Sequence, residues 1–194
     1  MLSVVAEGYC DILACRKLIH STGHEIEREF NCRGKGNLDK RLHGFVAAAE
    51  HFDWLVLRDL DADDICAPQL IARLVRTPLP ARLRFRIAVR AVEAWLFSDA
   101  GSLATWLKVS EGAVPRDPEA LADPKAAMAH LAARSRDRNL REGMTPDPHS
   151  GARVGPEYES CLADFVQNHW SPESAIEAGR SNSLGRAMAA LKAL

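Results

Sequence analysis

Asp53-Trp54-Leu55-Val56-Leu57-Arg58-Asp59 is the stretch that decides the fold class. Its apolar centre, Trp54–Leu57, is unbroken, as is typical of a strand that is covered on both faces. Such strands belong to parallel sheets, whose connections are usually helices. Helical patterns at about 38–51 and 68–75 flank the stretch, so the sequence predicts a βαβ arrangement.

The same alternation continues on both sides of this strand. Further strands are predicted at residues 2–6, 25–31 and 84–90, and a first helix at about 9–20. Beyond Glu93 the pattern is helical, with helices predicted near 91–98, 99–107, 123–135, 157–170 and 181–193. The stretch 138–156 is predicted to be a mobile loop, because it is rich in Pro, Gly, Asp and Arg. We therefore expect an α/β core of about four parallel strands at 1–98 and a helical C-terminal appendage at 99–194, or one continuous domain.

Composition and charge limit what kind of protein this chain can be. The chain has 194 residues and a formal net charge of -1, so any nucleic-acid binding must come from local patches. No apolar run approaches the roughly 18 residues that cross a bilayer, and the N-terminus lacks the pattern of a signal peptide. The five cysteines form no C-x-x-C pair. These features predict a cytoplasmic protein without a membrane partner.

Acidic residues follow the most strand-like segments. Glu7 follows the first strand, Asp59 and Asp61 follow the third, and Glu93 follows the fourth. The carboxyl ends of the strands are where open α/β sheets place their ligands, so these carboxylates are candidate ligands of Mg²⁺ or Mn²⁺.

Three acids close in sequence to these candidate ligands could instead stabilise the start of a helix. Asp63 is a candidate metal ligand, but Asp63 and Asp64 could instead cap the next helix. Asp11 is either an outer ligand or part of the acidic first turn of a helix.

Basic residues flank this acidic group. Between Asp64 and Glu93 there is no acid but there are six arginines, including Arg84, Arg86 and Arg90 on one predicted strand. Guanidinium groups suit phosphate, so this segment could hold a nucleic-acid backbone, although it could equally be solvated or paired with Asp59 or Glu93. Lys35, in a glycine-containing loop, and Arg58 are further candidate phosphate contacts.

Two motifs carry a family resemblance. Val5–Asp11 and Leu57–Asp64 resemble the signature motifs of the Toprim (topoisomerase-primase) domain, in the same order. Further stretches resemble small bacterial Toprim-like proteins related to the overcoming-lysogenisation-defect nucleases: Gly34–Asn37, Arg90–Leu96, Asp123–Lys125 and Val154–Tyr158.

The resemblance implies roles for individual residues. Glu7 would be the acid/base or metal-binding glutamate, Asp59 and Asp61 would be the Mg²⁺ ligands, and Glu93 would complete the site. The chain has no nucleophilic-tyrosine domain, winged-helix element or primase zinc segment, which leaves nuclease activity as the expectation.

The sequence therefore predicts a phosphodiesterase dependent on Mg²⁺ or Mn²⁺ that acts on DNA or RNA. Glu7 would be the general base, Asp59 and Asp61 would hold the metal, and Lys35, Arg86 and Arg90 would stabilise phosphate charge. One alternative is a non-catalytic component of a phage-defence or nucleic-acid-processing complex, with an ATPase as partner. Another is a small-molecule phosphatase or nucleotidyl enzyme that uses the same carboxylates.

Overall fold

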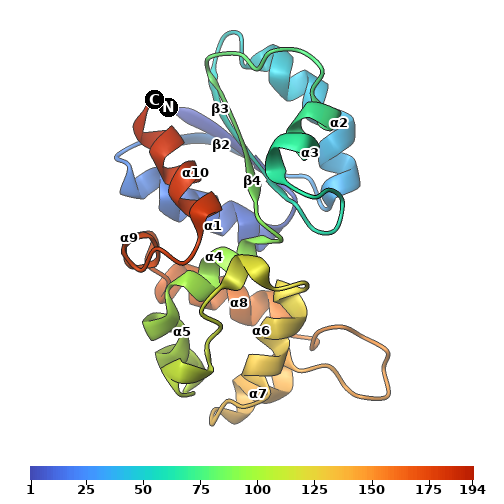
Figure 1. Cartoon of the computed structure of the whole chain (residues 1–194), viewed down its shortest axis with the longest axis vertical. Coiled ribbons are helices and arrows are strands. Elements are labelled where there is room, and N and C mark those ends of the chain that lie inside the picture. The colour runs from blue at the N-terminus through green and yellow to red at the C-terminus, as the bar shows by residue number, and fades with distance from the viewer. The chain divides into compact units, whose positions relative to one another are not determined.

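The computed structural model describes all 194 residues and divides them into two compact units (Figure 1). The first contains Met1–Val92 and Asn182–Leu194, and the second contains Glu93–Ser181. The last helix, α10 (Asn182–Lys192), belongs to the first unit. The two units are described separately below.

A four-stranded parallel sheet forms the centre of the first unit. Its strands are β1 (Leu2–Ala6), β2 (Ile26–Asn31), β3 (Asp53–Asp59) and β4 (Leu83–Ala88), in the order β2-β1-β3-β4. This sheet, with its flanking helices and the C-terminal helices, confirms the predicted fold class. The chain leaves β1 toward β2 and then crosses to the other side for β3, so the topological switch point lies between β1 and β3.

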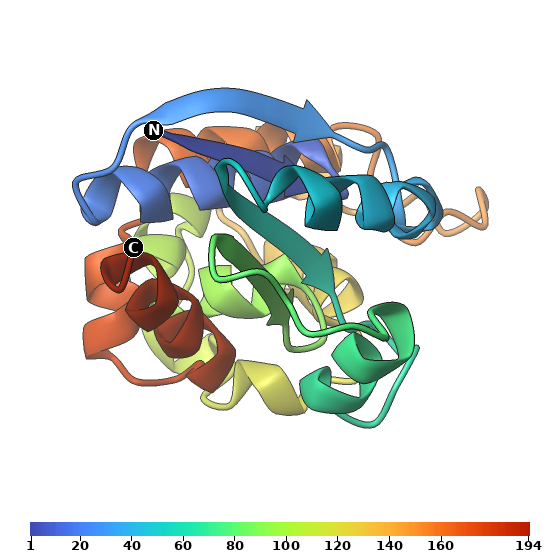
Figure 2. The same ribbon diagram turned by 90° about the horizontal axis from the view of Figure 1, so that it is seen from above.

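Helices cover both faces of the sheet, which explains why β1 and β3 are buried along nearly their whole length. On one face, α1 (Tyr9–Ser21) packs against β1 and β2, and α10 packs against β4. On the other face, α2 (Lys35–Ala48) contacts β3 and α3 (Ala67–Leu74) contacts β4. Figure 2 shows these two helix pairs on opposite sides of the strands.

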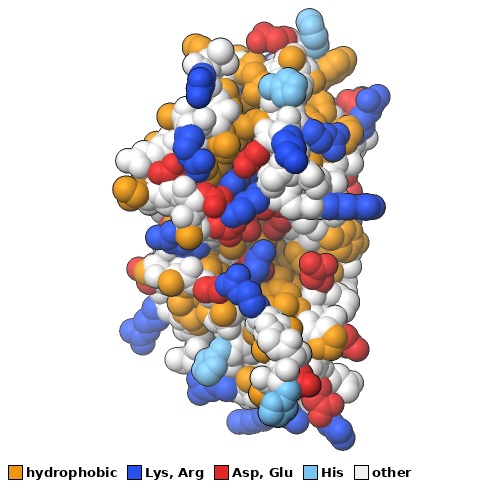
Figure 3. Space-filling model, turned by 90° about the vertical axis from the view of Figure 1, so that its right-hand side faces the viewer, with side chains coloured by type: hydrophobic (Ala, Val, Ile, Leu, Met, Phe, Trp, Pro, Cys, Tyr) orange, Lys and Arg blue, Asp and Glu red, His pale blue; other side chains and the backbone are white.

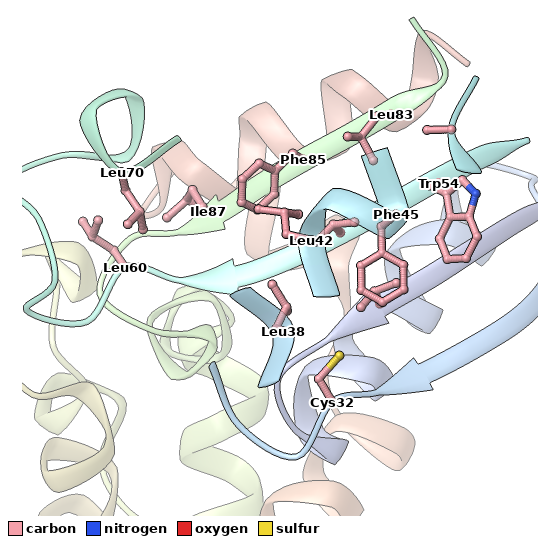
Figure 4. Packing of buried hydrophobic residues seen from close by; sticks show 13 residues of the cluster. Cys32, Leu38, Leu42, Phe45, Trp54, Leu60, Leu70, Leu83, Phe85 and Ile87 are labelled. Carbon is pink, nitrogen blue, oxygen red and sulfur yellow. The ribbon is translucent and has the colours of Figure 1, made fainter. Parts of the chain in front are cut away.

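The core beneath α2 and α3 is made of interleaved aliphatic and aromatic side chains (Figure 4). Phe45 of α2 lies 5.4 Å from Trp54 of β3, centroid to centroid, and Phe30 of β2 lies 5.5 Å from the same indole ring. Burying an aliphatic or aromatic side chain of this size contributes about 1.5–3 kcal/mol to stability. The core therefore anchors α2, whose N-terminus carries a predicted site residue, firmly against the sheet.

The second unit is helical. Its elements are α4 (Val92–Ser98, which begins at the last residue of the first unit), α5 (Ala100–Leu107), η1 (Glu111–Ala113), η2 (Pro118–Ala120), α6 (Pro124–Ala132), α7 (Arg138–Met144), α8 (Tyr158–Asn168) and α9 (Pro172–Glu177). No helix in either unit has the length and apolar character needed to cross a bilayer.

The prediction of a loop at 138–156 is wrong for its first part, where α7 forms. The Asp137 side chain caps this helix by accepting hydrogen bonds from the main-chain N–H groups of Asn139 and Leu140. Composition alone does not distinguish this short helix from a loop, because aspartate is common both at helix N-caps and in loops.

One motif that entered the family resemblance has a structural explanation. A Cβ atom at Gly155 would lie 2.2 Å from the main-chain oxygen of Gly143, so only glycine fits there without a shift of the backbone. The Gly155 N–H donates to the Met144 carbonyl at 2.9 Å, and the Glu157 N–H donates to the Gly143 carbonyl at 2.9 Å. This close crossing of two chain segments fixes the start of α8.

Candidate functional site

Glu7 and Asp59 meet at the switch point of the sheet. Glu7 follows β1 directly, and Asp59 is the last residue of the neighbouring strand β3. The Glu7 Oε1 atom accepts a hydrogen bond of 2.9 Å from the Asp59 main-chain N–H. The Glu7 carbonyl accepts another, of 2.8 Å, from the N–H of Gly34, just before α2. Three chain segments therefore converge on Glu7.

Burial changes the acidity of Glu7. Its side chain is 13% exposed, and this loss of solvent raises its pKa from 4.5 to about 7. The Asp59 amide and the positive charge of Arg58 act in the opposite direction, whereas the charges of Asp11 and Asp61 raise the pKa further. Glu7 can therefore take up and release a proton near neutral pH.

Asp59 is fixed in orientation. Its side chain is almost completely buried, and its Oδ1 atom accepts a hydrogen bond of 3.0 Å from the main-chain N–H of Val92. A carboxylate that is held by a main-chain amide has little freedom to rotate, so Asp59 and Glu7 form a preorganised pair.

Asp11 stabilises the beginning of α1. Its Oδ2 atom accepts a hydrogen bond of 2.7 Å from the Gly8 N–H, so the side chain reaches back over the first turn. Of the two interpretations of Asp11, the structure shows the helix-terminal contact. Its negative charge still acts on Glu7.

Arg58 is a buried counter-ion of the acidic cluster. Its side chain is 3% exposed and its Nη2 atom lies 3.0 Å from Asp39 Oδ2 and 2.6 Å from Asp63 Oδ2. The Nε atom lies 3.7 Å from Glu7 Oε1. Desolvation lowers the pKa of Arg58, but the hydrogen bonds to Asp39 and Asp63 outweigh it and raise the pKa above its usual value. We predicted Arg58 as a phosphate contact, and the structure places it inside the site among carboxylates.

Lys35 is the second counter-ion, at the first residue of α2. Its Nζ atom lies 2.8 Å from Asp61 Oδ2 and 2.9 and 3.0 Å from the two oxygens of Asp63. The hydrogen bonds to Asp61 and then Asp63 raise the pKa of Lys35. Asp63 thus contacts both cations, which identifies it as a member of the cluster.

The loops after β3 and β4 are tied together at the site. The Asp61 N–H donates to the Arg90 carbonyl at 2.7 Å, and the Arg90 guanidinium donates back to the Asp61 carbonyl at 2.8 Å. Both residues have left-handed backbone conformations, with φ values of 50° and 57°. Such conformations are unfavourable for residues with a Cβ atom, and they concentrate at functional sites.

The other predicted arginines lie on β4. Arg84 donates from Nε to the Ala190 carbonyl at 2.9 Å and from Nη2 to the Ala193 carbonyl at 3.2 Å, so it fastens the end of α10. Arg86 is half-buried, its Nε atom has no hydrogen-bond partner, and burial lowers its pKa. The hydrogen bonds of Arg84 give it a structural role, whereas Arg86 has no counter-ion that would satisfy its charge.

Glu93 belongs to the second unit. Its side chain is buried, and its Oε1 atom accepts a hydrogen bond of 3.2 Å from the Tyr158 hydroxyl of α8. One contact of Glu93 is therefore with another motif of the family resemblance, the stretch 154–158.

The cluster contains more carboxylates than cationic side chains. Its acidic members are Glu7, Asp11, Asp39, Asp59, Asp61 and Asp63, and its cationic members are Lys35, Arg58 and Arg90. Figure 3 shows a face of the molecule on which Asp and Glu side chains lie beside Lys and Arg side chains. No three His, Cys, Asp or Glu side chains are gathered around one point as a complete set of metal ligands. The site as it stands is a cluster of carboxylates linked by internal cations.

The second unit contains a separate hollow of about 820 Å³. It is lined by residues of α5, α7 and α8 and their flanks, among them Trp106, Lys108, Asn139, Asp164 and His169. None of the predicted site residues lines it.

Comparison with known proteins gives no family assignment, so the Toprim resemblance stays a prediction from the motifs. No family model, no curated protein and no solved structure matches the chain.

Proposed function

We propose that the protein hydrolyses phosphodiester bonds of DNA or RNA with the help of Mg²⁺ or Mn²⁺. The observation that supports this proposal best is the Glu7–Asp59 pair, which joins neighbouring strands at the switch point of the sheet. The pair lies in a cluster with twice as many carboxylates as cationic side chains. Such an excess of negative charge is relieved by binding a cation.

The donor atoms of this cluster fit the proposed ion. They are carboxylate oxygens, which Mg²⁺ and Mn²⁺ prefer, and Mg²⁺ needs only one or two protein carboxylates beside water and substrate phosphate. Asp59 and Asp61 would hold the metal, with Asp63 beside them, and Glu7 would act as the base instead. The contacts of the Lys35 ammonium group with Asp61 and Asp63 support this assignment, because a positive charge already lies beside these two carboxylates. When bound, the metal would supply positive charge against the phosphodiester oxygens and lower the pKa of an attacking water.

The protein's own residues would do the rest. Glu7, whose pKa is about 7, would accept the proton of the attacking water at neutral pH. Lys35 and Arg90 lie at the same sheet edge and could neutralise phosphate charge. Arg86, which was predicted to do the same, lies within β4 opposite Leu57 and not at the end of the strand. These assignments are consistent with a relationship to Toprim nucleases. We place the activity in the cytoplasm, in accordance with five free cysteines.

A second candidate is a non-catalytic component that works with a partner, such as an ATPase in phage defence. The observation that favours it is the pairing of Asp61 and Asp63 with Lys35 and Arg58, which neutralises part of the cluster without a metal. Under this alternative the carboxylates stabilise the fold and the isolated chain cleaves nothing.

A cleavage assay separates these candidates. Supercoiled plasmid, single-stranded DNA and single-stranded RNA are incubated with the wild type, Asp59→Asn, Asp61→Asn and the control Glu50→Gln, which changes an exposed acid outside the cluster. We expect cleavage that requires Mg²⁺ or Mn²⁺, that is lost in both aspartate variants and that persists in the control. Cleavage that persists in Asp59→Asn contradicts the proposed site. Absence of cleavage by the wild type on every substrate favours the non-catalytic candidate.

A further inference from the structure

We propose that Lys35 exchanges partners during function: a divalent cation displaces it from Asp61 and Asp63, and its freed ammonium group then binds a substrate phosphate. This inference rests on the proposed function of the same site. It assigns to one side chain both a counter-ion role in the metal-free protein and a phosphate-binding role in the loaded protein.

The first argument is the position of the ammonium group. Nζ lies within 3.0 Å of three carboxylate oxygens, from two acids that are separated by one residue in the loop after β3. Without a cation these two carboxylates, two positions apart, would repel each other. A divalent ion at the same oxygens would offer them twice the charge, so Lys35 and the ion compete for one place.

The second argument is the difference between the two counter-ions. The Arg58 side chain is 3% exposed, so taking it out of the cluster would require the surrounding core to open. The Lys35 side chain is 42% exposed and begins at the first residue of α2, beside Gly34 with its positive φ of 113°. An ammonium group on a flexible four-carbon chain can move to a nearby anion without leaving solvent. Arg58 is therefore the permanent counter-ion and Lys35 the exchangeable one.

The third argument is where the released group would go. α2 begins at the carboxyl end of β2, beside the switch point where open α/β sheets bind ligands. A phosphodiester that approaches the carboxylates brings the negative charge that Lys35 has lost. Lys35 can then bind a phosphate oxygen as a charge-assisted donor.

Metal binding alone tests the first half of the exchange. Mn²⁺ is titrated by calorimetry into the wild type, Lys35→Met, Lys35→Arg and the control Lys40→Met, which removes an exposed lysine of the same helix. Thermal denaturation verifies that each variant is folded. We expect Lys35→Met to bind Mn²⁺ about tenfold more tightly, whereas the other two variants match the wild type within about twofold. Unchanged or weaker binding by Lys35→Met overturns the displacement.

Phosphate binding tests the second half without relying on catalysis. A phosphorothioate oligodeoxynucleotide, which resists cleavage, is titrated at saturating Mn²⁺. We expect Lys35→Met to bind it about tenfold more weakly than Lys40→Met does, with a smaller dependence on salt concentration. Equal binding overturns the phosphate role.

The combination of results separates this inference from the proposed function. Tighter Mn²⁺ binding and weaker oligonucleotide binding by Lys35→Met, together with no cleavage by the wild type, support the exchange and contradict the nuclease proposal. If the wild type cleaves but Lys35→Met binds metal and oligonucleotide as the wild type does, the nuclease proposal is supported and the exchange is contradicted. No Mn²⁺ binding by any variant contradicts both.

Discussion

Replacing the buried Arg58 by methionine should destabilise the first unit substantially. Met fills a similar elongated volume but leaves Asp39, Asp63 and Glu7 without the guanidinium that contacts all three. Removing one partner of a fully buried ion pair costs about 3–5 kcal/mol. The Asp39 and Asp63 side chains are each 26% exposed and can regain some water, so we expect a loss of about 2–3 kcal/mol.

Urea denaturation followed by circular dichroism measures this loss in the wild type, Arg58→Met and the control Arg28→Met. Arg28 carries a side chain that is 69% exposed, so its replacement should change the free energy of unfolding by less than about 0.5 kcal/mol. In thermal melts the loss in Arg58→Met corresponds to a decrease of roughly 4–12 °C. An Arg58→Met protein whose stability equals that of the control would refute the role of Arg58 as the buried counter-ion.

Three further predictions concern stability. Glu7→Gln should stabilise the protein by up to about 3 kcal/mol above pH 7 and hardly at all at pH 4.5. The reason is that the folded-state pKa of Glu7 is about 7, so ionisation of Glu7 destabilises the folded protein as the pH rises from 4.5 to 7. A difference in urea denaturation that does not depend on pH would contradict this. Gly155→Ala should lower the free energy of unfolding by more than about 2 kcal/mol, whereas Gly185→Ala, whose Cβ meets nothing within 4 Å, should raise it by up to about 1 kcal/mol; equal melting temperatures of the two variants would count against the close crossing. Arg84→Ala should reduce the hydrogen-exchange protection of α10 by about 1–2 kcal/mol, because it removes two hydrogen bonds to the end of that helix; unchanged protection there would show that Arg84 does not hold it.

The sheet could be predicted from the sequence because its evidence is local. The apolar run Trp54–Leu57 and the alternation in β4 are properties of short segments, and the structure contains strands at both places. The convergence of Glu7 and Asp59 could also be anticipated, because parallel strands bring their carboxyl ends to one edge.

The partners of the site residues could not be predicted in the same way. Asp39 lies in the first turns of α2, and nothing local in the sequence indicates that it faces Arg58 of β3. The chain position of α10 likewise gives no sign that it returns to the first unit and receives hydrogen bonds from Arg84. Contacts between elements distant in sequence depend on how the helices pack, which hydrophobic periodicity does not specify.

Calorimetric titration of Mg²⁺ and Mn²⁺ into the wild type and Asp59→Asn is the most direct test of the central claim, that the carboxylates around Asp59 form a divalent-metal site. Asp59→Asn keeps an oxygen that can accept the Val92 N–H while it removes the negative charge. The account predicts saturable binding to the wild type and a loss of at least about tenfold in affinity in the variant. Equal binding by both proteins, or none by the wild type, would contradict it.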